Sequence, residues 1–207
     1  GLGGLGCSAS VYLAASGVGE LNLIDNDLID LSNLQRQILF SEADLNKKKV
    51  DTAKIKLSSL NENIKVNSSN LRLNKSNIRK ILEGSEIVLD CTDNFESRLI
   101  INKFCQNKKK ILVSAALQNF DIQAFIFSSW SNKKNPCYKC IFPNLTSDEN
   151  LSCDEMGIMA SVAGLGGIIQ ANLALNHILE LKSNFKELIL LDSLKLDIKK
   201  IKIEKNK

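Results

Sequence analysis

The amino-acid sequence predicts an α/β fold with a largely parallel sheet, and three observations lead to this prediction. Short apolar runs typical of buried strands alternate with stretches of helical spacing along most of the 207 residues. Gly1, Gly3 and Gly6 form a G-x-G-x-x-G pattern, the turn that brings backbone N–H groups to phosphate oxygens at a helix N-terminus. An apolar strand follows and ends on Asp25. A chain of this length most simply forms a single domain.

The first half of the chain alternates as such a fold requires. Residues 4–17 are predicted to be a helix that ends at Gly17, and LNLID (21–25) is predicted to be a buried strand. Further elements are predicted at 46–60 (helix), 64–70 (strand), 86–93 (strand) and 95–107 (helix).

The second half continues the pattern around one long loop. Strands are expected at 111–116, 121–127 and 188–193, an apolar helix at 158–181, and a short edge strand in the tail from 195 to 207. Residues 131–157 contain both prolines and three cysteines, which is typical of a functional loop. GLGG recurs at 164–167, where no strand delivers it, and close packing between helices explains it better than a second phosphate site.

Composition narrows the range of functions. With 44% hydrophobic and 24% charged residues, the chain is globular rather than disordered. Its lysine runs lack interleaved aromatic residues, so we expect no nucleic-acid partner. We find neither a membrane-spanning stretch nor a basic secretory signal, and expect no membrane association. Six cysteines are too few for a disulfide scaffold, which predicts a reducing compartment and a cytoplasmic location.

A nucleotide site is predicted where the glycines and Asp25 meet. An acidic residue about 20 residues beyond such a loop can accept both ribose hydroxyl groups. The alternative is that Asp25 only caps its strand. A dinucleotide-dependent oxidoreductase remains compatible with these two features.

Two polar segments point away from hydride transfer. DLSNLQRQ (30–37) presents Asn33 and Arg36, Lys49 follows, and CTDN (91–94) lies at the end of a buried strand. Because strand C-termini line the ligand crevice of an open α/β sheet, Asp25 and Asp93 should face one cleft. An Arg and a Lys near a phosphate loop, with an Asp suited to Mg²⁺, predict phosphoryl or nucleotidyl transfer. Taken singly, either cation could be ordinary solvated charge.

Together these segments resemble the ThiF/MoeB/HesA group, bacterial relatives of ubiquitin-activating enzymes that adenylate small sulfur-carrier proteins. The resemblance covers nearly the whole chain, in order and at compatible spacings. SNLQRQ and CTDN are its most specific parts. The matching segments are GLGGLG, LIDNDLIDLSNLQRQ, Lys49, LDCTDNFESR (89–98), PCYKC (136–140) and CDEMGIMASVAGLGGIIQA (153–171).

The resemblance implies a Rossmann-like fold, ATP as substrate, Mg²⁺ held by Asp93, and a homodimer. It implies a protein partner that is a small ubiquitin-like carrier ending in Gly-Gly, and a sulfur donor protein. Asn33, Arg36, Lys49 and Asp93 would be catalytic. The nucleotide would contact Gly3, Gly4, Gly6, Asp25, Ser32, Asn33, Leu34, Gln35, Arg36, Lys49, Asp93 and Asn94.

The cysteines of the long loop receive two implied roles. Cys137 and Cys140 would supply half of a structural zinc site, with a redox dithiol as the alternative. Cys153 stands where the family has a cysteine able to bond covalently to the carrier or its sulfur, and a loop near a helix start would favour its thiolate. A third zinc ligand or an inert thiol are the alternatives for Cys153. Cys7, Cys91 and Cys105 fall on apolar faces and are predicted to be core residues.

The resemblance also predicts a fragment. Family members have a helical segment and a first strand before the glycine loop, and a second C-x-x-C pair near the C-terminal end; we expect both to be missing from residues 1–207. A non-catalytic module that docks a carrier without activating it therefore remains an alternative. Molybdopterin, thiamine and tRNA-thiolation carriers are all compatible with the sequence.

Overall fold

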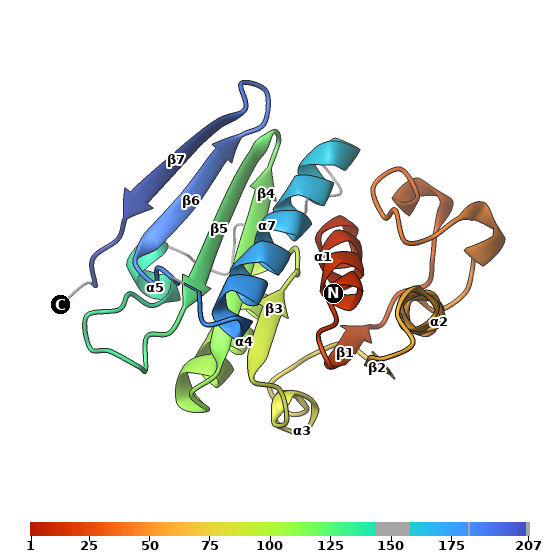
Figure 1. The fold of residues 1–207 in the computed structure, drawn as a ribbon, viewed down its shortest axis with the longest axis horizontal. Coiled ribbons are helices and arrows are strands. Elements are labelled where there is room, and N and C mark those ends of the chain that lie inside the picture. Colours follow the sequence, from red (N-terminus) through yellow and green to blue (C-terminus); the bar gives the residue numbers. More distant parts are fainter. Residues whose placement is uncertain (144–157, 182, 206–207) are drawn as a thin grey trace.

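The computed structural model describes residues 1–143, 158–181 and 183–205, and the fold is α/β (Figure 1). Helices cover both faces of the central sheet. In the strand β4 (Ile111–Gln118), Val113 belongs to an apolar cluster that includes residues of helices α1 (Gly4–Ala15) and α7 (Ala160–Ile178). Leu112 belongs to a cluster with helix α4 (Phe95–Asn107). Alternate residues of a strand point to opposite faces, so these clusters are the two layers of a helix-flanked sheet. The predicted Rossmann-like α/β fold is confirmed.

The first half of the chain forms parallel pairs. Strands β1 (Glu20–Asp25) and β2 (Lys65–Asn70) pair in parallel and are joined through α2 (Lys49–Leu60). Strand β3 (Ile87–Asp90) pairs in parallel with β4 through α4 (Phe95–Asn107). Parallel strands need such helical crossovers, which is why strand and helix alternate in the sequence.

From β4 onward the pairing is antiparallel. Strands β5 (Asp121–Phe127), β6 (Glu187–Asp192) and β7 (Asp197–Lys202) complete a five-stranded sheet in the order β3-β4-β5-β6-β7. The short Asn119–Phe120 connection, with Asn119 at a φ of 54°, permits only a hairpin. The five-stranded sheet is therefore mixed, with one parallel pair, β3–β4, and β1–β2 form a separate parallel pair. The fraction of parallel pairing is smaller than in the largely parallel sheet that the sequence predicts.

Most predicted elements lie within a few residues of their expected bounds. Helix α1 (Gly4–Ala15) is followed by Gly17 at a φ of +79°, a left-handed conformation that glycine adopts without strain. The strand expected at 86–93 ends at Asp90, because the Asp90 carboxylate accepts hydrogen bonds from the N–H and hydroxyl of Thr92 and turns the chain. The structure adds four short elements: η1 (Leu31–Asn33), η2 (Glu42–Asp44), α3 (Ile78–Leu82) and α5 (Tyr138–Ile141).

Helix α7 (Ala160–Ile178) packs directly against α1, and the two lie side by side in Figure 1. A Cβ atom on Gly167 would lie 2.3 Å from the Leu5 carbonyl oxygen, and one on Gly166 would lie 2.6 Å from the Leu5 side chain. The second glycine run therefore serves close helix packing, as predicted. Among the described residues, no helix has both the length and the apolar character needed to cross a bilayer.

Candidate nucleotide-binding site

A cleft of about 400 Å³ opens beside the N-terminus of α1, where β1 and β3 end. The cleft brings together residues from segments that lie far apart in the sequence. Those predicted from the sequence that line it are Gly3, Gly4, Asp25, Asn33, Arg36, Lys49, Asp93 and Asn94. Gly6, Ser32, Leu34 and Gln35 were predicted alongside them but do not line the cleft.

Three glycines near the N-terminus of α1, Gly3, Gly4 and Gly6, differ in their surroundings. Gly3 is the N-cap, and a Cβ added to it would have no neighbour within 4 Å. A Cβ on Gly6 would lie only 1.9 Å from the Gly1 carbonyl oxygen, and one on Gly4 would lie 2.7 Å from Ala163. Gly3 therefore leaves open space on the cleft side of the helix start, whereas Gly6 allows the turn to close upon itself.

Asp25 fixes the position of the glycine loop. One of its carboxylate oxygens accepts a hydrogen bond from Leu2 N–H at 2.6 Å, and the other accepts one from Asp27 N–H at 2.9 Å. Asp25 thus ties the end of β1 to the start of α1 as well as lining the cleft. The capping function considered from the sequence is present, and the ribose function stays a prediction.

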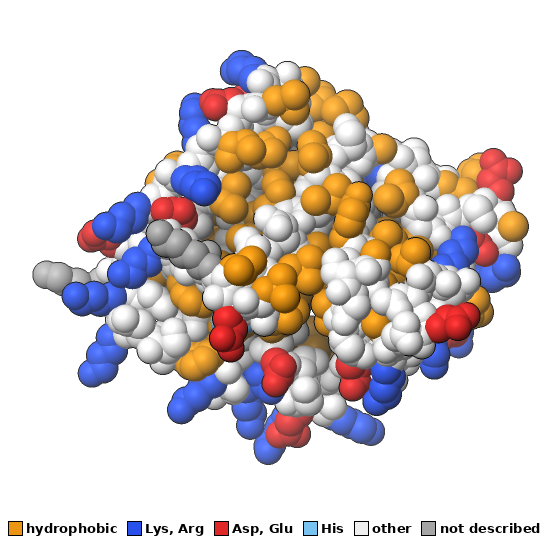
Figure 2. All heavy atoms as spheres, in the orientation of Figure 1, with side chains coloured by type: hydrophobic (Ala, Val, Ile, Leu, Met, Phe, Trp, Pro, Cys, Tyr) orange, Lys and Arg blue, Asp and Glu red, His pale blue; other side chains and the backbone are white. Residues whose placement is uncertain are grey.

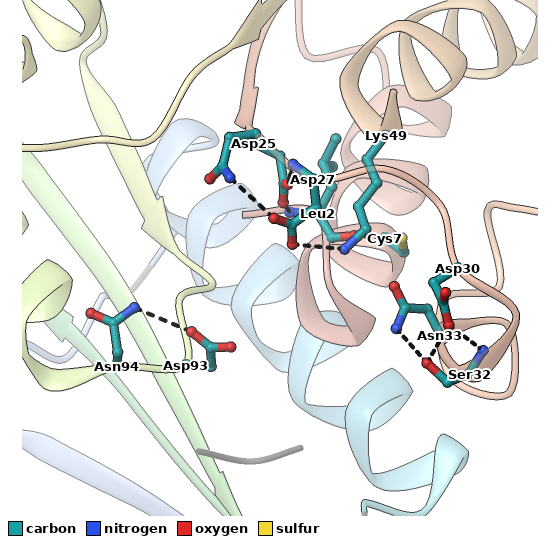
Figure 3. Close-up of polar contacts among 11 residues, drawn as sticks. Leu2, Cys7, Asp25, Asp27, Asp30, Ser32, Asn33, Lys49, Asp93 and Asn94 are labelled. Carbon is teal, nitrogen blue, oxygen red and sulfur yellow. Dashed lines mark hydrogen bonds and ion pairs between the residues drawn. The ribbon is translucent and has the colours of Figure 1, made fainter. Parts of the chain in front are cut away.

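Lys49 forms an ion pair that the sequence analysis missed. Its side chain is only 6% exposed, and its Nζ lies 3.1 Å from Asp27 Oδ2 (Figure 3). Asp27 also lines the cleft, and its own side chain is 58% exposed. Asp27 lies beyond the end of β1 at Asp25, so the spacing of the sequence gives no signal that pairs it with Lys49.

The SNLQRQ segment folds into a compact turn at the rim of the cleft. The Asp30 carboxylate accepts hydrogen bonds from Ser32 N–H at 2.8 Å and Ser32 Oγ at 2.6 Å, and these bonds lower the pKa of Asp30. The Asn33 carbonyl accepts a hydrogen bond from Arg36 N–H at 3.1 Å, and the Arg36 guanidinium donates to the Ser32 carbonyl at 3.3 Å. These contacts orient Asn33 and Arg36 toward the cleft.

The remaining residues of that turn anchor it. Leu34 packs against the core cluster formed around α1 and α2. The Gln35 amide donates to the Ile158 carbonyl at 3.3 Å, just before α7 begins. Ser32 is held by Asp30. The SNLQRQ segment thus contains both side chains that line the cleft and side chains that hold the turn in place.

Asp93 and Asn94 form the opposite wall. The exposed Asp93 carboxylate accepts a hydrogen bond from the Asn94 amide at 3.2 Å (Figure 3), and Asn94 Oδ1 accepts one from Ser97 N–H at 2.9 Å, which caps α4. The buried Arg98 donates to the Thr92 carbonyl at 2.7 Å and fixes the base of the turn. An exposed carboxylate on a rigid turn fits Mg²⁺, which binds through one or two carboxylates, water and substrate phosphates.

The C-x-x-C pair lies on the short helix α5, outside the residues that line the cleft. The Cys137 and Cys140 sulfurs are 3.3 Å apart and no disulfide joins them. Both could reach one tetrahedral ion, because Zn–S bonds of about 2.3 Å put two ligands roughly 3.8 Å apart. Within the described residues, no group of three or more His, Cys, Asp or Glu completes such a site. Burial and the neighbouring thiol raise the pKa of Cys137.

The other cysteines are less accessible. Burial raises the pKa of Cys7 to about 12, of Cys91 to about 11 and of Cys105 to about 12. Cys7 and Cys105 are buried core residues, as predicted, while the half-buried Cys91 donates to Gln170 Oε1 at 3.3 Å. Cys153 lies outside the described residues, so its covalent function remains a prediction.

Known proteins of similar sequence were compared with this chain. Residues 1–207 match the sequence profile of the ThiF family. The chain is 40% identical over 207 residues to the molybdopterin-synthase adenylyltransferase of Haemophilus influenzae and covers 84% of that protein. It is 36% identical over 207 residues to the enzyme of the same name from Escherichia coli K12, of which it covers 82%.

Solved structures show the same architecture. All of this chain superimposes on E. coli MccB crystallised with ATP, with a TM-score of 0.83 and 25% sequence identity, and it spans 63% of the length of that MccB chain. The family profile covers every residue, and both adenylyltransferases exceed one-third identity over the whole chain. This protein therefore belongs to the ThiF family.

Proposed function

We propose that this protein uses ATP to adenylate the C-terminal glycine of a small ubiquitin-like sulfur-carrier protein. The observation that carries the proposal is the convergence on one cleft of a glycine-capped helix start, two cations and an exposed carboxylate. The two relatives named molybdopterin-synthase adenylyltransferase favour the molybdopterin pathway over the thiamine and tRNA-thiolation pathways.

In the proposed reaction the carrier carboxylate attacks the α-phosphorus of ATP. A bond forms between a carboxylate oxygen and phosphorus, the bond to the bridging oxygen breaks, and pyrophosphate leaves with that electron pair. No general base is needed, because a carboxylate is already ionised at neutral pH. Negative charge grows on the phosphoryl oxygens, where preorganised cations stabilise the transition state.

Several residues of the cleft and of the turn at its rim have a part in this scheme. The backbone N–H groups beyond Gly3 would receive the phosphates, and Asp25 would accept the ribose hydroxyls. Arg36 and Lys49 would stabilise the charge on the α-phosphate, with Asn33 donating a further hydrogen bond. Ser32, Leu34 and Gln35 would act by holding the turn from which Asn33 and Arg36 project.

Two metals fit the residues present. Asp93 would hold Mg²⁺, which screens triphosphate charge when bound. Cys137 and Cys140 would supply two thiolates to a structural Zn²⁺, which cross-links the segments that ligate it. Cys153 would pass sulfur on after adenylation, or the donor protein would attack the adenylate directly.

We also propose that the protein is a homodimer. Several apolar side chains of α1, α7 and the segments flanking α7 are exposed: Tyr12, Met159, Ile168, Ile178, Leu179 and Leu181. Figure 2 shows hydrophobic side chains gathered over the face on which these two helices lie. An exposed apolar patch of this kind marks a protein interface.

ATP–pyrophosphate exchange tests the proposed activity. Exchange should depend on the carrier and on Mg²⁺, and a carrier lacking its terminal glycine should not support it. Arg36→Ala and Lys49→Ala should each lower exchange by about 10²–10³-fold, the usual effect of removing one preorganised contact to developing charge. A non-catalytic docking module would show carrier binding without exchange. An oxidoreductase would show hydride transfer without ATP consumption. Hydride transfer does not require the two cations, Arg36 and Lys49, that line this cleft.

A further inference from the structure

Asp27 and Lys49 form an ion pair, and both residues line the cleft, but Asp27 has no part in the scheme above. Lys49 is attached to Asp27 at both ends. Its ammonium lies 3.1 Å from Asp27 Oδ2, and its backbone N–H donates to the Asp27 carbonyl, also at 3.1 Å. Lys49 is the first residue of α2, so the second bond fixes the start of that helix.

Asp27 is itself held by the glycine loop. Its N–H donates to Asp25 Oδ1 at 2.9 Å, and its Oδ1 accepts a hydrogen bond from the Asn26 amide at 3.1 Å. The other oxygen of Asp25 accepts from Leu2 N–H at 2.6 Å. A continuous series of polar contacts therefore runs from the loop at the start of α1 through Asp25 and Asp27 to the Lys49 ammonium (Figure 3).

We propose that Asp27 is a positioning residue for adenylation, which holds the Lys49 ammonium in one orientation within the cleft until the phosphates arrive. The inference rests on the proposed function. A carboxylate in a triphosphate site repels the substrate, so its presence there needs a compensating use. Keeping a buried ammonium ordered and charged is such a use, because an uncompensated buried charge is strongly unfavourable.

Lys49 and Asp27 differ in how deeply they are buried, and this difference would let Lys49 exchange Asp27 for a phosphate partner. Lys49 is 6% exposed, and Asp27 is 58% exposed. When phosphate oxygens replace the carboxylate as partners of Lys49, the Asp27 carboxylate can turn to water at little cost. Lys49, by contrast, stays where its stem is packed. The lysine thus remains preorganised, which is the condition under which charge stabilisation is most effective.

Other ionisable groups also act on Lys49 or lie beside it. Hydrogen bonds from Ser32 lower the pKa of Asp30, and the charge of Lys49 adds to this effect. Burial raises the pKa of Cys7 in α1, and the charge of Lys49 opposes that rise. Arg36 lines the same cleft, and its positive charge repels that of Lys49. The groups that surround Lys49 are Asp25, Asp27, Asp30, Cys7 and Arg36. Asp27 is the one whose carboxylate contacts the ammonium in an ion pair.

The first test uses the full chain with carrier and ATP. In pyrophosphate exchange, Asp27→Ala should lower kcat by about 10–100-fold, the scale expected for a misplaced charge contact. Its KM for MgATP should stay the same or fall, because a repulsive charge is gone. Asp27→Asn keeps an oxygen for Lys49 and should recover most of kcat. Asp51→Ala is the matched control, since this carboxylate lies in the first turn of the same helix and bonds Ser68 instead.

The second test needs no activity. The rate of Lys49 acetylation by acetic anhydride at one fixed pH, followed by mass spectrometry, reports how firmly the ion pair with Asp27 holds the Lys49 side chain. In Asp27→Ala this rate should rise by about 10-fold, because the ammonium loses the carboxylate that it contacts. Asp51→Ala should leave the rate unchanged. If the wild type shows no exchange, the proposed function fails while the labelling result still decides the positioning role. An unchanged rate of Lys49 acetylation in Asp27→Ala, or a kcat equal to wild type, would overturn the inference.

Discussion

At the scale of single residues, two glycines of the glycine loop serve different purposes, one in ligand binding and the other in folding. Gly3 has open space where a side chain would go, and its φ of −75° and ψ of −161° suit any residue. Gly6 has no such space. A motif usually treated as one unit therefore contains one glycine that leaves room for a ligand and another that lets the backbone close.

This difference predicts opposite outcomes for two alanine substitutions. Gly3→Ala should keep the wild-type free energy of unfolding within about 0.5 kcal/mol, because the added methyl group meets no neighbour within 4 Å. It should nevertheless weaken ATP binding, because the methyl group occupies the space next to the phosphates. Gly6→Ala should destabilise the protein by about 1–3 kcal/mol through overpacking, or more. Urea denaturation and nucleotide titration of both variants measure this, and equal stability of the two would contradict it.

Residue-scale prediction from the sequence had a clear limit. The acidic end of a strand, the glycine turn and the CTDN turn share the carboxyl edge of parallel strands, so their convergence on one cleft could be predicted. The Asp27–Lys49 contact could not, because it depends on the path of residues 26–48 between β1 and α2. That path is fixed by tertiary contacts such as Ile29 N–H to the Lys47 carbonyl.

At the scale of elements, two glycines of α7 that lie near α1 differ in how closely they are packed. A Cβ at Gly167 would lie 2.3 Å from backbone, whereas one at Gly164 would lie 3.8 Å from Ser8 Oγ, an ordinary contact distance. Gly167→Ala should therefore destabilise the fold by about 1–3 kcal/mol. Gly164→Ala, in the same helix, should be neutral or stabilising by up to about 1 kcal/mol through helix propensity. Chemical denaturation compares them, and destabilisation of similar size in both would refute the packing argument.

The short helix η2 supplies a prediction about pH. Asp44 accepts hydrogen bonds from the N–H and hydroxyl of Ser41 and contacts the Lys56 ammonium, and these partners hold its pKa well below the usual range. Because the folded pKa is depressed, this contribution to stability is full above pH 4 to 5 and is lost as the pH falls further.

Asp44→Asn should accordingly lower the free energy of unfolding at pH 7 by about 1 kcal/mol, the usual size of a cap contribution. The gap between variant and wild type should narrow steadily below pH 4. Urea denaturation from pH 7 to pH 3 measures it, with the exposed Glu62→Gln as a control that should follow the wild type throughout. A gap that does not change with pH would mean that the charge of Asp44 has no part in capping.

At the scale of the whole molecule, the exposed apolar face of α1 and α7 predicts self-association. Ile168→Lys places a charge on this face and should shift the protein toward monomer in sedimentation velocity. Leu194→Lys, on the β6–β7 hairpin, also replaces an exposed apolar side chain and should leave the sedimentation coefficient unchanged. Monomeric wild-type protein at all concentrations would exclude the dimer.

The overall architecture was largely predictable, and its main departure has a physical cause. Alternation of strand and helix predicts parallel pairing only while a helix separates successive strands. The connections from β4 to β5 and from β6 to β7 contain no helix, and these two antiparallel pairs follow from their short turns. Strands β5 and β6 also pair antiparallel although α5 and α7 lie between them, and the short turns do not explain that pair. The order in which distant strands pair is decided by side-chain packing across the sheet, which a single sequence does not display.

The glycine contact between α1 and α7 also has a consequence during translation. The two helices are separated by roughly 150 residues of chain. At about 5–20 residues per second, α7 leaves the ribosome roughly 8 to 30 seconds after α1. Through that interval the apolar side of α1 has no α7 to cover it, and the cleft lacks the helix that packs against its glycine loop. The nascent chain therefore completes this cleft late in its synthesis.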